Sequence, residues 1–389
     1  MTKVTRNAPY SAESKNRPPL AIRRVEAIPV SIPLVKPVLM GGGQEFRRSE
    51  SLVVRIETTN GLFGWGEASA APTMTGDTLP GMVEAVEKYL APRLIGQNAL
   101  DRALLAHRMS QTLIGNTGAK AACDIALHDL AGKHLGVSVT DLLGGRARER
   151  VLALAQLGNA KVEQDIAEAK AKQRQGYGFF KLKVGVKPVE QEIESAYTLR
   201  KALGPDALLC ADANMGMTVA SAHKFVAGAA GAGLLFLEQP FRDNDLANTL
   251  ALARSSAIPL CADESAQNIE SIMDWHRTGA IAGVNLKTIK LGGIVETMRA
   301  AIVAHTLGLA VNLASKTGES SIGAAALVHL GYTVPNLDWG ININNHYLDT
   351  DLVKQPLKQK SGSIECPGGA GLGVEVDEDA LRRFRVDKR

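Results

Sequence analysis

Hydrophobic and polar residues alternate over the first part of the chain, between about residues 21 and 68. The runs AIRRVEAIPVSIPL and ESLVVRIETTNGLFGWGEAS have the period of two that is typical of half-buried strands. Asn60-Gly61 predicts a hairpin turn, whereas KPVLMGGGQEFRR follows no period and is predicted as a loop. Between residues 79 and 143 the apolar spacing becomes helical, so this region is predicted to be an α+β domain.

After residue 150, short apolar runs alternate with amphipathic helical segments about every 25–30 residues. Parallel strands joined by helices give this alternation, and eight such runs favour a closed α/β barrel. A doubly wound open sheet is the alternative, but no GxGxxG follows the first run. The eight predicted strands are 151–157, 179–185, 207–214, 234–240, 258–265, 283–289, 310–316 and 336–341.

Five of these runs carry a charged residue at or near their carboxyl end, spaced 24 to 29 residues apart: Lys183, Asp212, Glu238, Asp263 and Lys287. A single acid at such a place is often only the cap of the following helix. Five charged residues that follow the strand–helix repeat are better explained by one shared rim of the barrel. That rim is where barrel enzymes carry their chemistry.

Three carboxylates, those of Asp212, Glu238 and Asp263, are predicted to converge at this rim. Burying them together is strongly unfavourable unless a cation neutralises them. An oxygen-only ligand set suits Mg²⁺, with Mn²⁺ as the alternative, and leaves positions for a substrate. Zn²⁺ fits less well, because neither His nor Cys recurs at the strand ends.

Lys181 and Lys183 in FFKLKVG are two residues apart, so their side chains point to the same side of a strand. A second ammonium and a divalent cation nearby predict a lowered pKa for Lys183, which could then act as a base. Lys287 is predicted to lie across the barrel. A cation between two lysines could hold a substrate carboxylate and stabilise the enediolate formed when a proton leaves its α-carbon.

Composition excludes several other functions. The formal net charge of +4 is small and no long basic run occurs, which predicts no nucleic-acid or anionic-membrane partner. No apolar run reaches the roughly 18 residues that a membrane span needs. Residues 1–20 are polar and are predicted to be a disordered lead-in without a signal-peptide core, so a cytoplasmic location is expected. The four cysteines are scattered and are predicted to be free.

The motifs together resemble the enolase superfamily, in particular its muconate lactonizing enzyme subgroup. The resemblance covers about residues 21 to 385. It implies a modified TIM barrel, (β/α)₇β, beneath an N-terminal α+β capping domain. The matching motifs are KxK (Lys181, Lys183), DAN (Asp212, Asn214), LEQP (Glu238, Gln239), ADES (Asp263, Glu264) and VNLKTIKLGG (Lys287). The implied parts are a capping domain 21–148 with a lid loop 38–48, a barrel 149–350 and a C-terminal segment 351–389 that returns to the cap.

The resemblance also implies roles for these residues. Asp212, Glu238 and Asp263 would be the metal ligands, and Lys183 and Lys287 would exchange protons on opposite sides of a small carboxylate substrate. Lys181 would assist Lys183. Four further residues are expected beside the metal or the substrate, and two in the lid: Asn214, Glu264, Glu319, Asn342, Arg47 and Arg48. A homo-oligomer is implied as well.

The last strand departs from the family pattern. SKTGESSIG, with Glu319, resembles the cycloisomerase and succinylbenzoate group, but WGIN places Asn342 where muconate cycloisomerases have the acid of WGTE. Amides at 342 and 344 suit a neutral or anionic substrate group rather than an ammonium. The predicted function is a Mg²⁺-dependent, muconate cycloisomerase-like isomerase. The alternatives are an amino-acid or proline-type racemase or epimerase, a dehydratase, and a non-catalytic carboxylate-binding barrel, which would need no second lysine.

Overall fold

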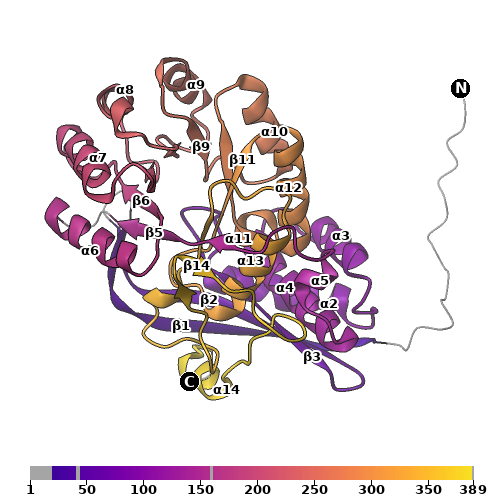
Figure 1. The fold of residues 1–389 in the computed structure, drawn as a ribbon. Helices are drawn as coiled ribbons and strands as arrows, with labels where there is room; N and C mark the ends of the chain where they lie inside the picture. Colours follow the sequence, from indigo (N-terminus) through magenta and orange to yellow (C-terminus); the bar gives the residue numbers. More distant parts are fainter. Residues whose placement is uncertain (1–19, 41–43, 158–160, 388–389) are drawn as a thin grey trace, which may run out of the picture.

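The protein folds into a three-stranded sheet with helices, followed by a barrel whose strands are surrounded by helices (Figure 1). The structure is a computed structural model that describes residues 20–40, 44–157 and 161–387. The predicted lead-in lies almost entirely outside the described residues. Among the described helices, none combines the length and the apolar character that crossing a bilayer requires.

The first sheet consists of β1 (Ile22–Met40), β2 (Gln44–Thr58) and β3 (Phe63–Ser69), all antiparallel. The turn predicted at Asn60-Gly61 is confirmed, because the Thr58 amide donates to the Leu62 carbonyl at 2.9 Å and Gly61 has a φ of +85°. Gly61 tolerates this left-handed conformation because it lacks a Cβ.

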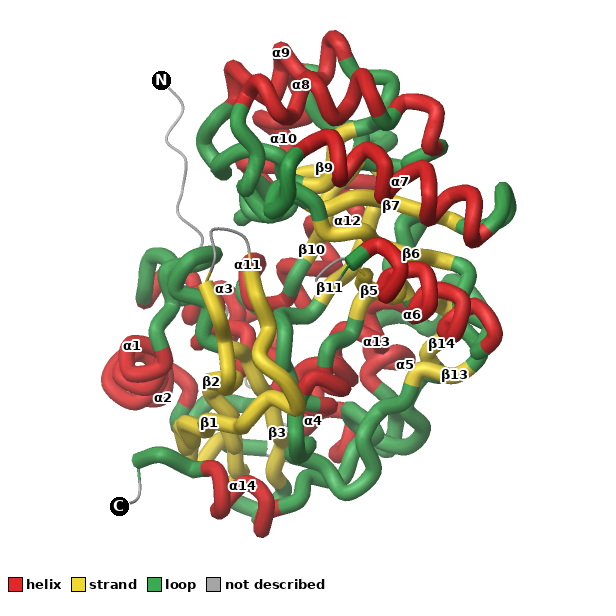
Figure 2. Tube along the Cα trace, turned by 90° about the vertical axis from the view of Figure 1, so that its left-hand side faces the viewer, coloured by secondary structure: helices red, strands yellow, loops and turns green. Residues whose placement is uncertain are grey.

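The prediction of an irregular loop over 38–48 is wrong for its described flanks. Val38 pairs with Phe46 and Met40 with Gln44, so β1 and β2 continue as one hairpin toward the barrel (Figure 2). The long β1–β2 ladder extends its hydrogen bonding past the point where the side-chain alternation is lost. Residues 41–43 of the predicted lid lie outside the described part of the chain.

Helix α4 (Thr117–Leu135) is the central, mostly buried helix of the first unit and packs against β3. Gly64 and Gly66 of β3 let the strand approach this helix closely, since a Cβ on Gly66 would lie 2.0 Å from the Ala122 carbonyl oxygen. The other helical segments of this unit are α1 (Leu79–Glu84), the π-helical η2 (Ala85–Leu90), α2 (Ala91–Leu94), α3 (Arg102–Thr112) and α5 (Val139–Leu142).

The predicted α/β barrel is confirmed. Eight parallel strands follow one another in sequence order around the sheet, and a bridge between Ala153 and Ile341 joins its two edges. The strands are β5 (Leu154–Leu157), β6 (Phe179–Lys183), β7 (Leu208–Asp212), β8 (Leu237–Glu238), β9 (Leu260–Ala262), β10 (Gly283–Leu286), β11 (Ala310–Ala314) and β12 (Ile341–Asn342).

Within the described part of the chain, seven helical connections link these strands, as (β/α)₇β requires. They are α6 (Val162–Arg174), α7 (Val189–Leu203), α8 (Val219–Gly228) with η3 (Ala230–Ala232), α9 (Leu246–Ser255), α10 (Ile269–Thr278), α11 (Thr288–Leu291) with α12 (Ile294–Thr306), and α13 (Ser321–Thr333).

The barrel interior below the strand ends is filled by apolar side chains, among which the rings of Phe236 and Trp339 stack with their centroids 4.1 Å apart. Cys210 and Cys261 belong to this layer and are free thiols.

Two acids of the first unit bind the amino ends of barrel helices. Asp124 of α4 accepts a hydrogen bond from the Ile294 amide at 2.6 Å, at the start of α12. Glu67 of β3 accepts hydrogen bonds from the amides of Ser320 at 3.0 Å and Gly323 at 3.1 Å, at the start of α13. Carboxylates are stabilising at helix amino ends, because unpaired N–H groups and the helix dipole favour negative charge there.

The last part of the chain contacts both units. Its elements are η4 (Asn345–Tyr347), β13 (Gln359–Lys360), β14 (Ser363–Ile364) and α14 (Glu378–Phe384), and β14 pairs with β4 (Val151–Leu152) before the barrel. After α14, the Val386 amide donates to the Pro29 carbonyl of β1 at 3.0 Å. Figure 1 accordingly shows α14 beside the first sheet.

We expect Gly66→Ala to lower the free energy of unfolding by about 1–3 kcal/mol, because the added methyl group overpacks the contact between β3 and α4. Urea denaturation measures the change. Gly178→Ala is the matched control, since a Cβ at Gly178 meets no atom within 4 Å and should shift stability by less than about 0.5 kcal/mol. Equal stability of the two variants would show that the close approach is not a constraint.

Candidate active site

The charged strand-end residues predicted from the sequence line one cavity at the carboxyl end of the barrel. Lys183, Asp212 and Glu238 are the last residues of β6, β7 and β8, and they are neighbours in the sheet register. Asp263 and Lys287 directly follow β9 and β10. Because β6 and β10 are four places apart in an eight-stranded ring, Lys183 and Lys287 reach the cavity from opposite sides.

Each of the three carboxylates contacts a lysine ammonium. Lys183 Nζ lies 2.6 Å from Asp212 Oδ2 and 2.6 Å from Asn214 Oδ1. Lys181, one layer deeper and buried, donates to Glu238, and Lys287 donates to Asp263. These contacts compensate charges that would otherwise be very costly to bury.

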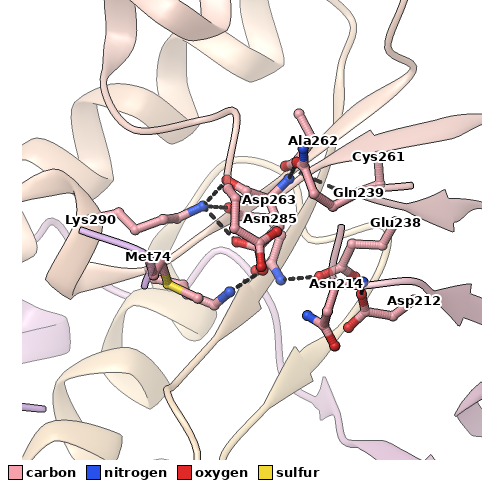
Figure 3. A network of polar contacts seen from close by, with 12 residues as sticks. Met74, Asp212, Asn214, Glu238, Gln239, Cys261, Ala262, Asp263, Asn285 and Lys290 are labelled. Carbon is pink, nitrogen blue, oxygen red and sulfur yellow. Dashed lines mark hydrogen bonds and ion pairs between the residues drawn. The ribbon is translucent and has the colours of Figure 1, made fainter. Parts of the chain in front are cut away.

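Lys290 is a further lysine of this network that the sequence analysis missed. Its ammonium is completely buried and lies 2.7 Å from Asp263 Oδ1 and 2.7 Å from the Asn285 carbonyl oxygen. Figure 3 shows Lys290 pointing toward Asp263. Its spacing of three residues from Lys287 in KTIK was the available signal, since residues three apart share a helix face.

Asn285 was missed as well. Its side-chain nitrogen Nδ2 donates to Glu238 Oε1 at 2.8 Å (Figure 3), and its side chain lines the cavity. It lies on β10 two residues before Lys287, so the period of two places both on the same side of the strand. A polar residue in the apolar run GVNL was the signal.

The backbone around the carboxylates is held in sparsely populated conformations. Asn214, Met215 and Gln239 have φ values of 40°, 62° and 37°, a region that non-glycine residues adopt rarely. Gln239 Oε1 accepts the Asp263 amide at 2.9 Å, so one residue couples the ends of β8 and β9. Such conformations cluster at functional sites, where the surrounding structure enforces them.

Burial and neighbouring charges set the protonation of the network. Burial disfavours charge on Asp212 and Asp263, but the adjacent lysines outweigh it and lower the pKa of both carboxyls. Burial and the nearby Asp212 raise the pKa of Glu238, which lies between the two other acids. Burial opposes charge on Lys181 and Lys287, yet the carboxylates raise the pKa of both amines.

Glu264 and Glu319 are buried but do not line the cavity. Each has a carboxyl oxygen without a hydrogen-bond partner among the described residues. Burial and Asp263 raise the pKa of Glu264 to about 8, and burial and Glu67 raise the pKa of Glu319 to about 8. Both residues therefore belong to the surroundings of the site, and their predicted roles stay predictions.

Asn342 and Asn344, at the end of β12, do line the cavity. The Asn344 side chain donates to the Ser315 carbonyl at 2.9 Å. The carboxamide oxygens of both residues are buried without a hydrogen-bond partner within the described chain. The position where the sequence departs from the family pattern thus contributes polar, uncharged groups.

The two arginines predicted in the lid do not reach the cavity. Arg48 donates to the Ser31 hydroxyl at 2.8 Å and so binds β1. Arg47 pairs with Glu45 and its side chain is 73% exposed. The hairpin instead contributes Val38 to the cavity wall.

The acids of the site are suitable ligands for a divalent cation, both in their chemistry and in their positions. No three His, Cys, Asp or Glu side chains of the described residues form a ready-made ligand set, since the carboxylates here contact lysines. Asp212, Glu238 and Asp263 nevertheless supply oxygen donors at three consecutive strand ends, which is the ligand chemistry that Mg²⁺ and Mn²⁺ prefer.

Comparisons with known proteins identify the family of this chain. Residues 23–144 match the family model of the mandelate racemase/muconate lactonizing enzyme N-terminal domain, and residues 164–380 match the enolase C-terminal domain-like model. A chloromuconate cycloisomerase from Cupriavidus necator is 30% identical over 368 residues, covering 93% of this chain and 99% of that protein.

Two solved structures are similar over nearly the whole chain. The muconate lactonizing enzyme from Pseudomonas fluorescens, complexed with muconolactone, has a TM-score of 0.89 and 29% identity, and covers 95% of this chain and 100% of that one. The N-succinyl Arg/Lys racemase from Bacillus cereus has a TM-score of 0.88 and 27% identity, and covers 94% and 98%.

We expect Glu319→Gln to stabilise the protein increasingly as the pH rises from about 4.5 to 8. The folded protein holds a proton on Glu319 that the unfolded chain has released above its ordinary pKa of about 4.3, so wild-type stability is lost across this window. The expected gain at pH 8 is on the order of a few kcal/mol, measured by urea denaturation at several pH values. Glu365→Gln, at an exposed position, should show no such trend. A gain in stability that does not depend on pH would contradict the raised pKa of Glu319.

Proposed function

Because the chain belongs to the mandelate racemase/muconate lactonizing enzyme family, and is thus an isomerase-type enzyme of the enolase superfamily, we propose that it is a cycloisomerase dependent on Mg²⁺ or Mn²⁺. It would move a proton at the α-carbon of a small carboxylate through an enediolate. The observation that carries this proposal is the pair of lysines on opposite sides of three acids in one cavity. A carboxylate-binding protein without catalysis would not need both lysines.

Asp212, Glu238 and Asp263 are the residues that would hold the cation, which when bound supplies positive charge beside the substrate carboxylate. Lys181 adds a buried positive charge next to Glu238 in the wall of the cavity, where it can act electrostatically. Gln239 and Lys290 position Asp263 from two sides, through its amide and its carboxylate. The acids are therefore held by the chain itself.

Lys183 is the better placed of the two lysines for proton transfer. Its side chain is 18% exposed, against 7% for Lys287, and it borders the cavity with Asn214 as a hydrogen-bond partner. Lys287 lies across the cavity, where its positive charge would stabilise the negative charge that develops on the substrate. In a cycloisomerisation one lysine carries the proton and the other acts through its charge.

A racemase or epimerase is the second candidate. It is favoured by the same opposed lysines, since removing and returning a proton on opposite faces needs a carrier on each side. The structural similarity to the Bacillus cereus N-succinyl Arg/Lys racemase supports the same candidate. A cycloisomerase and a racemase differ in whether both lysines must transfer protons.

Asp212→Asn, Glu238→Gln and Asp263→Asn should each lower activity by at least about 10³-fold, because each removes a charged ligand of the cation. Activity is followed on cis,cis-muconate and other carboxylates, and binding of Mn²⁺ alone by equilibrium dialysis. Asp206→Asn, at an exposed position, is the control and should leave both unchanged. Full activity after exhaustive chelation, or wild-type Mn²⁺ binding in all three variants, would refute the metal assignment.

Lys183→Ala and Lys287→Ala separate the two candidate reactions, and either change should cost about 10²–10⁴-fold in turnover. Solvent deuterium exchange at the substrate α-carbon is measured by NMR. In a cycloisomerase, Lys183→Ala should abolish exchange and Lys287→Ala should only slow it. In a racemase each variant should exchange one enantiomer only. Exposed Lys201→Ala serves as the control, and wild-type exchange in both active-site variants would show that the lysines are structural.

A further inference from the structure

Lys316 lines the same cavity but has no part in the reaction proposed above. It lies two residues after β11, in the loop that leads to α13. Its side chain is partly buried, and burial lowers the pKa of its amine, with Glu319 and Glu50 only partly opposing this. A cation has therefore been placed in the wall of the site at an energetic cost.

Lys316 differs from the other lysines of the site in its partners. Lys181, Lys183, Lys287 and Lys290 each lie within 4.0 Å of a carboxylate. In the part of the chain that the structure describes, Lys316 forms no such ion pair, and its Nζ lies 5.8 Å from the centre of the Phe46 ring. A partly buried ammonium next to a cavity is stabilised by an anion that enters it.

The fold holds this loop firmly in place. On one side, the Ser315 amide donates to the Asn342 carbonyl at 2.9 Å, and the Asn344 amide donates to the Ser315 hydroxyl at 3.0 Å. On the other side Gly318, with a φ of +77°, packs so closely on Ser49 of the hairpin that a Cβ would lie 2.7 Å from it. Lys316 is thus fixed between the barrel rim and the β1–β2 hairpin, which is the preorganisation that binding requires.

We propose that Lys316 is a specificity-determining residue that binds a second carboxylate of the substrate, remote from the carboxylate at the reacting carbon. This inference rests on the proposed function for the first carboxylate. The acids of the cavity already have lysine partners, and Arg47 and Arg48 are engaged elsewhere, so Lys316 is the cation left for a second negative charge among the described residues. A single ammonium suits a carboxylate, whereas phosphate sites gather several N–H donors.

The test compares dicarboxylates with monocarboxylates of equal chain length. Succinate and butyrate, glutarate and valerate, and adipate and hexanoate are titrated by calorimetry into the full-length protein with saturating Mg²⁺, and again without it. Wild-type protein should bind the dicarboxylate at least about tenfold more tightly at one of the chain lengths, as expected for a hydrogen bond between charged groups. The chain length with the largest preference reports the separation of the two anionic subsites.

Lys316→Met should abolish this preference while leaving the monocarboxylates within about twofold of wild type. Lys316→Arg should keep most of it, and Lys201→Met should keep all of it. Lys316→Gln is a second neutral variant in case Lys316→Met does not fold, which circular dichroism reveals. The proposal is overturned if wild-type protein shows no preference at any length, or if the preference survives in the neutral variant. An equal loss of affinity for dicarboxylates and monocarboxylates in the neutral variant would also overturn the proposal.

These outcomes are independent of turnover. Absence of α-proton exchange with every carboxylate would refute the proposed function, yet the difference in affinity between paired ligands would still be measurable. A preference that persists without Mg²⁺ and vanishes in Lys316→Met would support Lys316 even then. The reverse result, turnover without any contribution from Lys316, would remove this inference and leave the proposed function intact.

Discussion

Burying an ammonium or a carboxylate costs several kcal/mol unless an opposite charge meets it. At the carboxyl end of this barrel, four buried or nearly buried lysines meet three acids: Lys181, Lys183, Lys287 and Lys290 with Asp212, Glu238 and Asp263. Neither set could be buried there without the other. The strained turns at Asn214 and Gln239, and the amide of Asn285, hold these charges in register.

The same compensation makes the site adaptable. Each acid that contacts a lysine here is also a potential cation ligand, so a bound cation would compete with the lysine for the same carboxylate. The capping unit takes part through its hairpin, which lines the cavity with Val38 and covers Lys316 with Phe46. Whether this hairpin acts as a lid stays a prediction, as do the homo-oligomeric state and the exact domain boundaries.

The sequence was sufficient to predict the barrel and its central charged residues. The strand–helix repeat places the carboxyl end of every strand at one rim, and these residues lie at or just after the strand ends. It predicted Asp212, Glu238, Asp263, Lys183 and Lys287 in one cavity, and the structure has them there. It missed Lys290, which the short helix α11 returns to the site, because the spacing of three residues from Lys287 was not used. It expected Arg47 and Arg48 in a lid loop beside the site, whereas hairpin pairing directs Arg48 toward Ser31. Contacts between residues far apart in sequence, such as Glu67 with Ser320, leave no local signal.

The acids that cap barrel helices from the other unit, Asp124 on α12 and Glu67 on α13, have a consequence for how this architecture can diversify. A barrel joined to a foreign cap would present two helix ends with unpaired N–H groups, and the cap would carry two buried, uncompensated carboxylates. Cap and barrel are therefore not interchangeable modules. Substitutions in the hairpin and the strand-end loops can instead change the cavity while leaving the seam between the two units intact.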